Sequence, residues 1–388
     1  MAARWIWEQP DWPRFRWDEP SIRRALEAAH EQRAQLLQLL AQLDLQHSRE
    51  VSAALLSRES LSTAGIEGEQ LDPAEVRSSL ARRLQLPLEP QASKPSARVE
   101  GLIQLLLTAT SDPTTPLSIE TLQTWHNTLF AAGPDGFQSV AIGELRGDQP
   151  MQVVSGPIGR ETVHFQAPPR QGLEQELKLL LSWFNQPPAD PNQAEGLIRA
   201  GLSHLWFVTL HPFEDGNGRL ARALTDRALA QLSPVAVKVH HALSLSSRIQ
   251  QERQAYYLQL ERCQKGSLDI TPWLLWFLEQ VAAACSHNAA VVRAVQAKAL
   301  FWWHHQHHNF NARQRKLLNR LLDAEPEGFE GGMTLRKAIN LTRASRATAW
   351  RDLRELVDLQ ALEPIGAGRS SAYRIRWPTI SPWTPFAC

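Results

Sequence analysis

The stretch that decides the fold is His211-Pro212-Phe213-Glu214-Asp215-Gly216-Asn217-Gly218-Arg219-Leu220-Ala221-Arg222. Apolar residues with the spacing of one helix face precede it, at Ile198, Leu202, Leu205 and Trp206. A second run with a helical pattern follows it, from Ala221 to Leu232. The twelve residues are therefore predicted to form a turn between two helices.

The turn has the composition of an anion-binding site. Gly216 and Gly218 allow a positive φ and a close approach of the backbone, so successive N–H groups can point at one anion. The next helix begins here and presents the positive end of its dipole. We therefore predict a phosphate-binding turn at Gly216, Asn217 and Gly218.

Four side chains beside the turn suit nucleotide chemistry. Asp215 supplies the oxygen ligand that Mg²⁺ prefers, and Arg219 and Arg222 lie three apart on one helical face, where they can bind further phosphate oxygens. His211 belongs to the residue type that titrates near neutral pH and can act as a base. A Gly-Asn-Gly turn without such neighbours would indicate only the end of one helix and the start of the next.

The same residues resemble the signature of the Fic family, His-Pro-Phe-x-Asp/Glu-Gly-Asn-Gly/Lys-Arg-x-x-Arg, at every fixed position. The resemblance implies a mainly α protein, a Fic-type helical bundle, that moves AMP from ATP to a Ser, Thr or Tyr hydroxyl of a protein, itself included. His211 would then be the general base, Asp215 would hold Mg²⁺ and Arg222 would take the γ-phosphate. The other phosphate oxygens would be bound by Gly216, Asn217, Gly218 and Arg219.

A second motif lies upstream, in Ser62-Thr63-Ala64-Gly65-Ile66-Glu67-Gly68-Glu69. Thr63 and Glu67 are four residues apart and Gly68 marks the end of a helix, so the pattern alone indicates a solvated helix terminus. Beside the first motif, Thr63-x-x-x-Glu67-Gly68 resembles the inhibitory helix of the Fic family. This resemblance implies that Glu67 pairs with Arg222 in place of the ATP γ-phosphate, so we expect an autoinhibited resting state.

Two short runs between these motifs predict a β-hairpin. Met151 to Val154 and Thr162 to Phe165 are rich in β-branched residues and flank a Gly/Pro turn. In the Fic family a hairpin at this place is the flap, which holds the target segment by strand addition.

Two adjacent tyrosines, Tyr256 and Tyr257, fall on a helix predicted to start near Ser247. Tyrosines in such positions are typical of core packing. The family resemblance makes one of the two a candidate contact to adenine.

The N-terminal part contains an aromatic arm over residues 1–19 and a long helix expected from Ser21, as its N-cap, to about Gln46. The arm and helix resemble the small accessory domain of unknown function that often precedes Fic domains. The proline-rich segment 86–98 is a candidate linker. We predict three domains: an accessory domain with the inhibitory helix (1–90), a catalytic domain (91–300) and a C-terminal domain (311–388).

The C-terminal domain resembles a winged helix-turn-helix module. Helices are predicted over 312–322, 335–339 and 345–356, and a tight hairpin over 366–375. Residues 333–354 carry six basic side chains against Asp352 alone: Arg336, Lys337, Arg343, Arg346, Arg351 and Arg354.

Such a basic face favours DNA binding, with Arg346, Thr348 and Arg351 expected to face the groove. The alternative is a module for protein contacts or dimerisation. Members of the Fic family often self-associate, so a homodimer is a further hypothesis, although no residue of this chain points to one.

Composition sets wider bounds. The 388 residues are 43% apolar and 21% charged with a net charge of +1, which is ordinary for a soluble globular protein and names no partner. The start of the chain lacks a signal-peptide pattern, and no apolar run approaches the roughly 18 residues of a membrane span. Three scattered cysteines suit a reducing compartment. We therefore expect a cytoplasmic protein that does not bind a membrane.

Other activities remain open at this stage. Some proteins with the same motif remove AMP, transfer phosphate or attach phosphocholine, and Glu67 keeps AMP removal among the hypotheses. The chain could instead be a DNA-binding regulator that senses nucleotide. The run His304-His305-Gln306-His307-His308 suggests either a metal patch or a solvated helix end, and the lack of a neighbouring Cys or carboxylate cluster favours the second.

Overall fold

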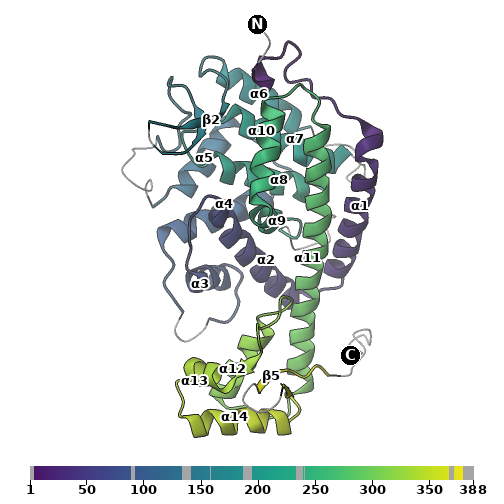
Figure 1. The fold of residues 1–388 in the computed structure, drawn as a ribbon, viewed down its shortest axis with the longest axis vertical. Helices are drawn as coiled ribbons and strands as arrows, with labels where there is room; N and C mark the ends of the chain where they lie inside the picture. The colour runs from purple at the N-terminus through teal and green to yellow at the C-terminus, as the bar shows by residue number, and fades with distance from the viewer. Residues whose placement is uncertain are drawn as a thin grey trace. The chain divides into compact units, whose positions relative to one another are not determined.

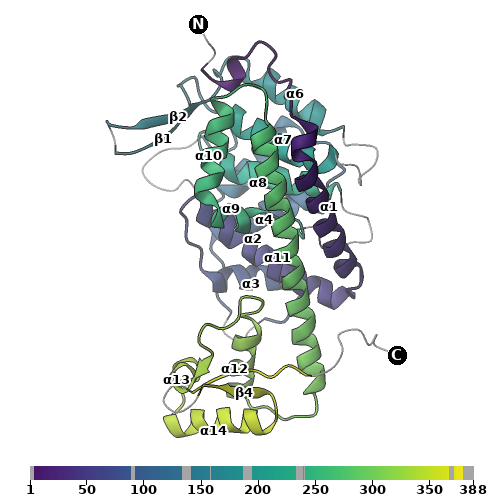
Figure 2. The ribbon, with the colours of Figure 1, turned by 45° about the vertical axis from the view of Figure 1, so that its right-hand side comes forward.

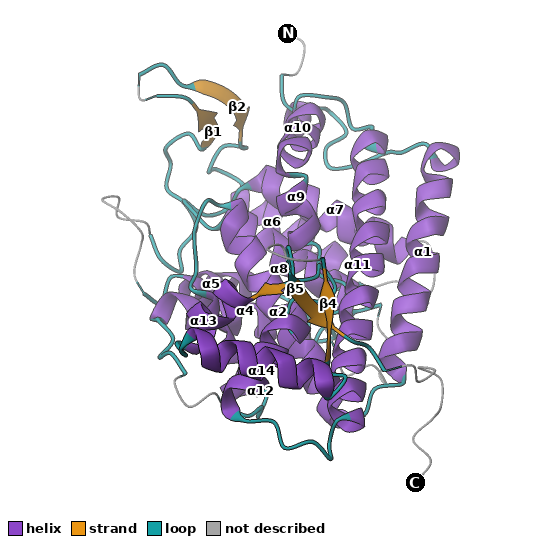
Figure 3. Cartoon of the chain, turned by 60° about the horizontal axis from the view of Figure 1, so that its bottom comes forward, coloured by secondary structure: helices purple, strands orange, loops and turns teal. Residues whose placement is uncertain are grey.

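The computed structural model describes residues 4–88, 92–132, 141–157, 159–186, 195–232, 239, 241–366 and 371–378. The chain divides into two compact units, residues 1–289 (unit 1) and 290–388 (unit 2). Helices dominate the described residues, with two small antiparallel sheets (Figure 1; Figure 3, strands in orange). The predicted mainly α class with a small hairpin is confirmed.

Unit 1 is built from one 3₁₀ turn, a series of helices and one hairpin. In chain order these are η1 (Ile6–Glu8), α1 (Glu19–Ala41), α2 (Leu45–Ile66), α3 (Pro73–Arg83), α4 (Ala97–Ser111), α5 (Ile119–Leu129), β1 (Gln152–Ser155), β2 (Thr162–Gln166), α6 (Leu173–Phe184), α7 (Glu195–Leu210), α8 (Asn217–Ala230), α9 (Ser246–Gln251), α10 (Arg253–Gln264) and α11 (Thr271–His304). The last helix begins in unit 1 and continues into unit 2.

The centre of unit 1 is the helix pair α7 and α8. Every residue of α7 from Gly196 to Leu210 is buried, and in α8 all but Gly218 are buried. A helix that is enclosed on all sides carries apolar residues around most of its circumference, as α7 does. The pair packs against α2, α4, α5 and α6, so the turn between α7 and α8 is held from several directions.

Helix α2 ends in a hydrogen-bonded turn that fixes the chain beyond it. Gly68 N–H donates to the Gly65 carbonyl at 3.1 Å and Glu69 N–H to the Ala64 carbonyl at 3.0 Å. With Gly68 at φ +83°, these two bonds form a Schellman motif, in which the left-handed position favours glycine. Residues 67–69 therefore have a defined backbone position rather than the geometry of a frayed end.

The predicted start of the first long helix was wrong. Asp18, rather than Ser21, is the N-cap of α1, and its carboxylate accepts from Ser21 N–H at 3.0 Å. Pro20 in the first turn is compatible with this start, since its missing N–H falls where a helix lacks partners. The helix ends at Ala41, and α2 starts again after the N-cap Asp44.

The aromatic arm packs on the body of unit 1 and holds the base of the hairpin. Strands β1 and β2 pair antiparallel with Val153 opposite Phe165 (Figure 2, where the hairpin extends from the helices). Trp5 packs edge-on against Phe165 with ring centroids 5.5 Å apart, and the indole N–H of Trp7 donates to the Gln166 carbonyl at 2.8 Å. Residue 158, within the predicted Gly/Pro turn between the two strands, lies outside the described residues.

Unit 2 contains the end of α11, three further helices and a three-stranded sheet. They are α12 (Ala312–Leu322), β3 (Met333–Thr334), α13 (Leu335–Thr342), α14 (Arg346–Asp358), β4 (Leu362–Ile365) and β5 (Ala372–Ile375), with strand order β3-β5-β4. Leu317, Leu321, Leu353 and Leu356 are among the buried residues of its core. The predicted hairpin turn includes residues 367–370, which lie outside the described residues, and the winged-helix assignment stays a prediction.

The three predicted domains are not tested by this division into two units. The boundary predicted at 90/91 falls on residues 89–91, and the end of the C-terminal domain falls on residues 379–388; both lie outside the described residues. None of the helices in the described parts of the chain combines the length and the apolar character needed to cross a bilayer.

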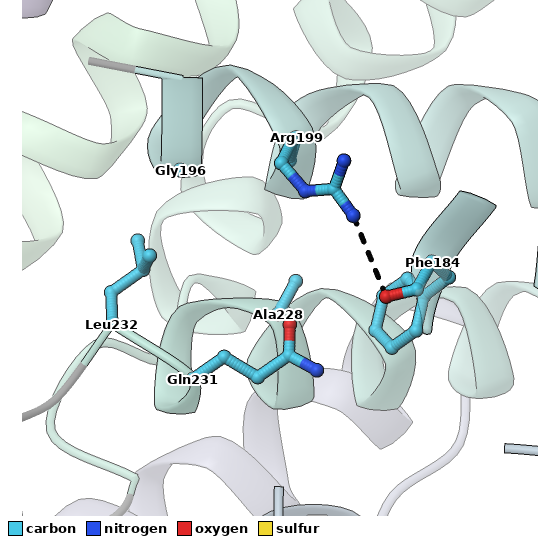
Figure 4. A pocket seen from close by; sticks show the side chains of 6 residues that line it. All are labelled: Phe184, Gly196, Arg199, Ala228, Gln231 and Leu232. Carbon is cyan, nitrogen blue, oxygen red and sulfur yellow. Dashed lines mark hydrogen bonds between the residues drawn. The ribbon is translucent and has the colours of Figure 1, made fainter. Parts of the chain in front are cut away.

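A pocket near the start of α7 belongs to helix packing (Figure 4). It is lined by Phe184, Gly196, Arg199, Ala228, Gln231 and Leu232. Arg199 donates to the carbonyl oxygens of Trp183 and Phe184 at the end of α6, at 2.8 and 3.5 Å. His211 is at the other end of α7, roughly 20 Å away at the rise of an α-helix, so this pocket is separate from the motif.

Candidate active site

The motif turn is held in one conformation by its own asparagine. Asn217 accepts from Phe213 N–H through its Oδ1 at 2.9 Å and donates to the Phe213 carbonyl through its Nδ2 at 2.8 Å. Phe213 is fully buried, which anchors the turn in the core. Helix α7 stops before the turn because His211 takes a left-handed φ of +49° and Pro212 cannot continue a helix.

His126 of α5 supports the turn from outside, a role that the sequence analysis missed. Its ring stacks on Phe213 with centroids 4.3 Å apart and planes 11° apart. The Gly143 N–H donates to its Nδ1 at 2.9 Å, so the ring proton is on Nε2, which donates to the Asp215 carbonyl at 3.2 Å. Burial lowers the pKa of His126, which keeps the ring neutral for this arrangement.

Arg146 is a second supporting residue that the sequence did not single out. It is 2% exposed, and its guanidinium donates to the carbonyls of His211 at 2.8 Å and Pro168 at 2.6 Å. Its own N–H donates to the Pro212 carbonyl at 2.9 Å. Arg146 therefore joins the motif turn to the segment that follows the hairpin.

His211 is arranged as a neutral base. Its Nδ1 lies 3.1 Å from the Val208 carbonyl, which can only accept, so Nδ1 carries the proton and Nε2 has a free lone pair. Burial is the main cause that lowers the pKa of His211 below its ordinary value, and the nearby charge of Arg146 acts in the same direction. The ring is thus unprotonated at neutral pH.

The N-terminus of α8 starts at a glycine. Gly216 is its N-cap at φ +74° and, as a glycine, provides no side-chain cap to the first turn. A Cβ on Gly216 would meet the ring of Phe130 at 2.9 Å, so both backbone and space require glycine there. A Cβ on Gly218 would meet Glu67 Oε1 at 2.5 Å, which places that carboxylate directly over the turn.

Arg222 is paired with the end of α2. Its Nη2 donates to Glu67 Oε1 at 2.7 Å, its Nε to the Thr63 hydroxyl at 2.7 Å, and Nη2 also to the Thr63 carbonyl at 3.1 Å. Burial opposes ionisation of Glu67, but the charge and hydrogen bond of Arg222 hold its pKa below the ordinary value. The contact that the family resemblance implies is present, while its inhibitory role stays a prediction.

Arg219 has its own acidic partner, which the sequence analysis did not identify. Its Nη1 donates to Glu69 Oε1 at 2.5 Å, and its Nη2 lies 3.7 Å from Asp215 Oδ1. Within the described residues, two buried N–H groups of the motif arginines lack an acceptor: Nε of Arg219 and Nη1 of Arg222. A buried donor without an acceptor costs about 1–3 kcal/mol, so both groups favour an added anion.

Two buried carboxylates lie behind Arg222 and were also missed. Glu59 accepts from the N–H and the hydroxyl of Ser246, and Asp226 accepts from the Ser244 hydroxyl at 3.2 Å. Burial raises the pKa of Glu59, and burial together with the charge of Glu59 raises that of Asp226 well above its ordinary value. The pair therefore holds a proton to a higher pH than two separate carboxyls would.

Asp215 is the predicted metal ligand, and its carboxylate is 55% exposed at the side of the turn. One of its oxygens accepts from Gly216 N–H at 2.6 Å. In the described parts of the chain, no three His, Cys, Asp or Glu side chains are grouped so that they alone could hold a metal ion. An ion at Asp215 would therefore need ligands from a bound phosphate, as Mg²⁺ usually does.

The histidine run at residues 304–308 and the tyrosine pair at residues 256–257 each include a buried side chain. His305 is buried against Phe301, 4.5 Å between ring centroids, and burial lowers its pKa to about 4, so this part of the run is core rather than a solvated end. Tyr256 is also buried and its hydroxyl bonds His204 Nε2 at 2.8 Å. Tyr257 is 40% exposed, and its hydroxyl donates to the Ile66 carbonyl at 3.4 Å. The adenine contact stays a prediction.

Comparison with known families gives two matches. Residues 116–229 match the Fic/DOC family, and residues 5–86 match a domain of unknown function, DUF4172. The first match covers the turn, His126 and Arg146, and the second covers α1, α2 and the Glu67 segment.

Individual relatives are distant. A protein adenylyltransferase Fic from Nematostella vectensis is 32% identical over 109 residues, which are 28% of this chain. The chain spans only 22% of the length of that relative. Among solved structures, Fic-1 from C. elegans is similar with a TM-score of 0.50 and 18% identity over 71% of this chain and 74% of that one. A Fic family protein from Desulfovibrio desulfuricans has a TM-score of 0.47 and 17% identity, over 90% of this chain and 95% of that one.

The bonds of Asn217 generate a stability prediction. Asn217→Ala leaves the buried N–H and carbonyl of Phe213 unpaired, so the free energy of unfolding should fall by about 2–5 kcal/mol. Asn217→Asp keeps the acceptor and loses the donor, so its free energy of unfolding should lie between those of wild type and Asn217→Ala. Urea denaturation followed by tryptophan fluorescence measures this, and wild-type stability of Asn217→Ala would contradict the role of the asparagine.

Proposed function

This chain is a Fic domain protein, and we propose that it transfers AMP from ATP to a side-chain hydroxyl of a protein. In the reaction, the hydroxyl oxygen bonds to the α-phosphorus of ATP while the bond from that phosphorus to the pyrophosphate oxygen breaks. The hydroxyl proton goes to His211, and pyrophosphate leaves. The name of the Nematostella relative, a protein adenylyltransferase, agrees with this reaction.

The observation that carries the proposal is the set of unused donors around one turn. The N-cap of α8, Gly216, provides no side-chain cap, and Nε of Arg219 and Nη1 of Arg222 lack an acceptor among the described residues. A chain of phosphates supplies several oxygens to such donors at once. The Glu67 carboxylate over Gly218 is an anion already held at this place.

His211 is proposed as the general base. Its Nε2 is the free nitrogen, because Nδ1 is bound to the Val208 carbonyl. A base with a pKa lowered by burial is unprotonated at neutral pH and ready to accept the hydroxyl proton. Arg146 supports this position, since it holds the His211 carbonyl.

Asp215 is proposed to hold Mg²⁺ together with the phosphates. A single exposed carboxylate fits an ion that keeps water and takes its other ligands from a nucleotide. When bound, Mg²⁺ would neutralise charge on the leaving pyrophosphate. Tyr257 is proposed as the contact to adenine, because it is 40% exposed near the end of α2 whereas Tyr256 is buried.

Glu67 is proposed to inhibit the resting protein. Its carboxylate uses the Nη2 donor of Arg222 and covers Gly218, so it competes with phosphate for both groups. Because Arg222 is 3% exposed, exchange of one anion for another is far easier than leaving the charge unpaired.

Intact mass after incubation with ATP and Mg²⁺ tests the proposal. Glu67→Gly should gain about 329 Da per AMP added to itself or to an added protein mixture. Wild type should gain at least about tenfold less, since the Arg222 pair must first break, and Glu67→Gly/His211→Ala should gain nothing. Glu31→Gln, an exposed charge change on α1 that keeps Glu67, is the control and should gain no more than wild type.

The other outcomes separate the alternatives. A gain of about 80 Da would indicate phosphoryl transfer instead. No gain in any variant, with loss of AMP from a modified protein offered without ATP, would favour AMP removal. Equal gain with and without His211 would contradict its assignment as the base.

We propose DNA binding by unit 2 as a second function, on one observation. Helix α14 exposes Arg346, Trp350, Arg351 and Arg354, while the acidic Asp352 is buried in bonds to Arg313 and Asn311. Its last turn also exposes Glu355 and Asp358. Thr348, predicted to face a groove, lies in the helix cap, 2.9 Å from the Ser345 hydroxyl. The positive surface is thus confined to residues 346–354, and its three arginines fit a phosphate backbone.

A gel shift of the full chain on duplex DNA at several salt concentrations tests this function. Arg346→Ala/Arg351→Ala should weaken binding and lower the salt slope by about 2, one for each phosphate contact. Arg293→Ala removes an exposed arginine of α11 and is the matched control. No binding by wild type at low salt would contradict the proposal.

A further inference from the structure

We infer that Glu69 is a second inhibitory carboxylate, which occupies Arg219 while Glu67 occupies Arg222. The inference rests on the proposed function and concerns the regulation of the same site. Arg219 and Glu69 are joined at 2.5 Å, with side chains only 7% and 18% exposed. This burial distinguishes the pair from a surface ion pair, which contributes little.

The end of α2 places both carboxylates at once. Glu67 is the C-cap and Glu69 follows the left-handed Gly68, and the two bonds of the Schellman motif fix this spacing. Side chains on either side of such a reversal can reach two residues that lie one turn apart on a facing helix. Arg219 and Arg222 have that separation on α8. The single turn at the end of α2 can therefore supply a carboxylate to each arginine.

The ion pair of Glu69 with Arg219 uses an N–H donor that a bound phosphate would need. Arg219 donates through Nη1 to Glu69, and its Nη2 lies near Asp215. Its guanidinium also lies over the Phe130 ring, 5.1 Å from the ring centroid. Its Nε remains without an acceptor among the described residues. Arg219 is thus held beside the turn in a neutralised state, and a nucleotide must displace Glu69 to use it fully.

A consequence follows for Glu67 variants. Removing the Glu67 carboxylate frees Arg222 but leaves Glu69 on Arg219, because the Schellman bonds are made by the backbone. Glu67→Gly should therefore be only partly released. Full release requires that the end of α2 move away or that both carboxylates be neutralised.

The test compares Glu67→Gly, Glu69→Gln, Glu69→Ala and the two Glu67→Gly/Glu69 double variants. Affinity for Mg·ATP is measured by calorimetry, and AMP transfer by intact mass. Each Glu69 change should tighten ATP binding about 3- to 10-fold, alone and in the Glu67→Gly background, which is about 0.7–1.4 kcal/mol. Glu31→Gln, an exposed charge change on α1, should leave both unchanged.

The outcomes separate this inference from the proposed function. If Glu69 variants bind ATP more tightly but no variant transfers AMP, the proposed function fails and the inference stands. If Glu67→Gly transfers AMP and the Glu69 changes alter neither affinity nor rate, the inference is overturned and the function stands. If ATP binds to no variant, both are wrong.

Gly68→Ala provides a second variant with both carboxylates intact. A Cβ there would meet nothing within 4 Å, so only the left-handed φ of +83° is strained. The strain should loosen the turn that places Glu69 and raise ATP affinity in the same direction. Unchanged affinity together with an unchanged Glu69→Ala variant would overturn the role of this turn.

Discussion

The buried positive charge of Arg222 is the constraint on which unit 1 depends. A guanidinium that is 3% exposed requires an anionic partner, because an unpaired buried charge costs several kcal/mol. In this structure Glu67 is the partner, and the phosphates of a nucleotide are the proposed replacement. The proposed inhibition then needs no change of fold. It needs only that the Glu67 carboxylate, which α2 carries, and the phosphates of a nucleotide compete for the Arg222 guanidinium with different affinities.

The turn proposed to receive the nucleotide is held by hydrogen bonds from three sides. Asn217 closes it from within, His126 holds the Asp215 carbonyl from α5, and Arg146 holds the His211 and Pro212 carbonyls. These bonds fix the donors and the base in place, so that little ordering remains to be done when the substrate arrives. The mobile part of the system is then expected to be the acidic end of α2 rather than the motif.

How far the sequence predicts this arrangement depends on the range of each interaction. The turn, its glycines and Arg219 and Arg222 follow from local spacing, and the pairing of Glu67 with Arg222 follows from a family pattern. His126, Arg146, Glu59 and Asp226 could not be found in this way, since each gains its meaning from a partner far along the chain and none stands in a recognisable motif. Glu69 lies two residues after Glu67, but its partner is 150 residues away. His305 looked solvated by composition and is core, because Phe301 lies one helical turn before it.

The measurement that tests the central claim most directly is a crystal structure of Glu67→Gly with Mg²⁺ and an ATP analogue that cannot be cleaved. The account predicts that the triphosphate lies across the N-terminus of α8 over Gly218, with its terminal phosphate on Arg222. The α-phosphorus should face Nε2 of His211. A nucleotide bound elsewhere, or a turn left empty with Arg222 re-paired to another carboxylate, would contradict it.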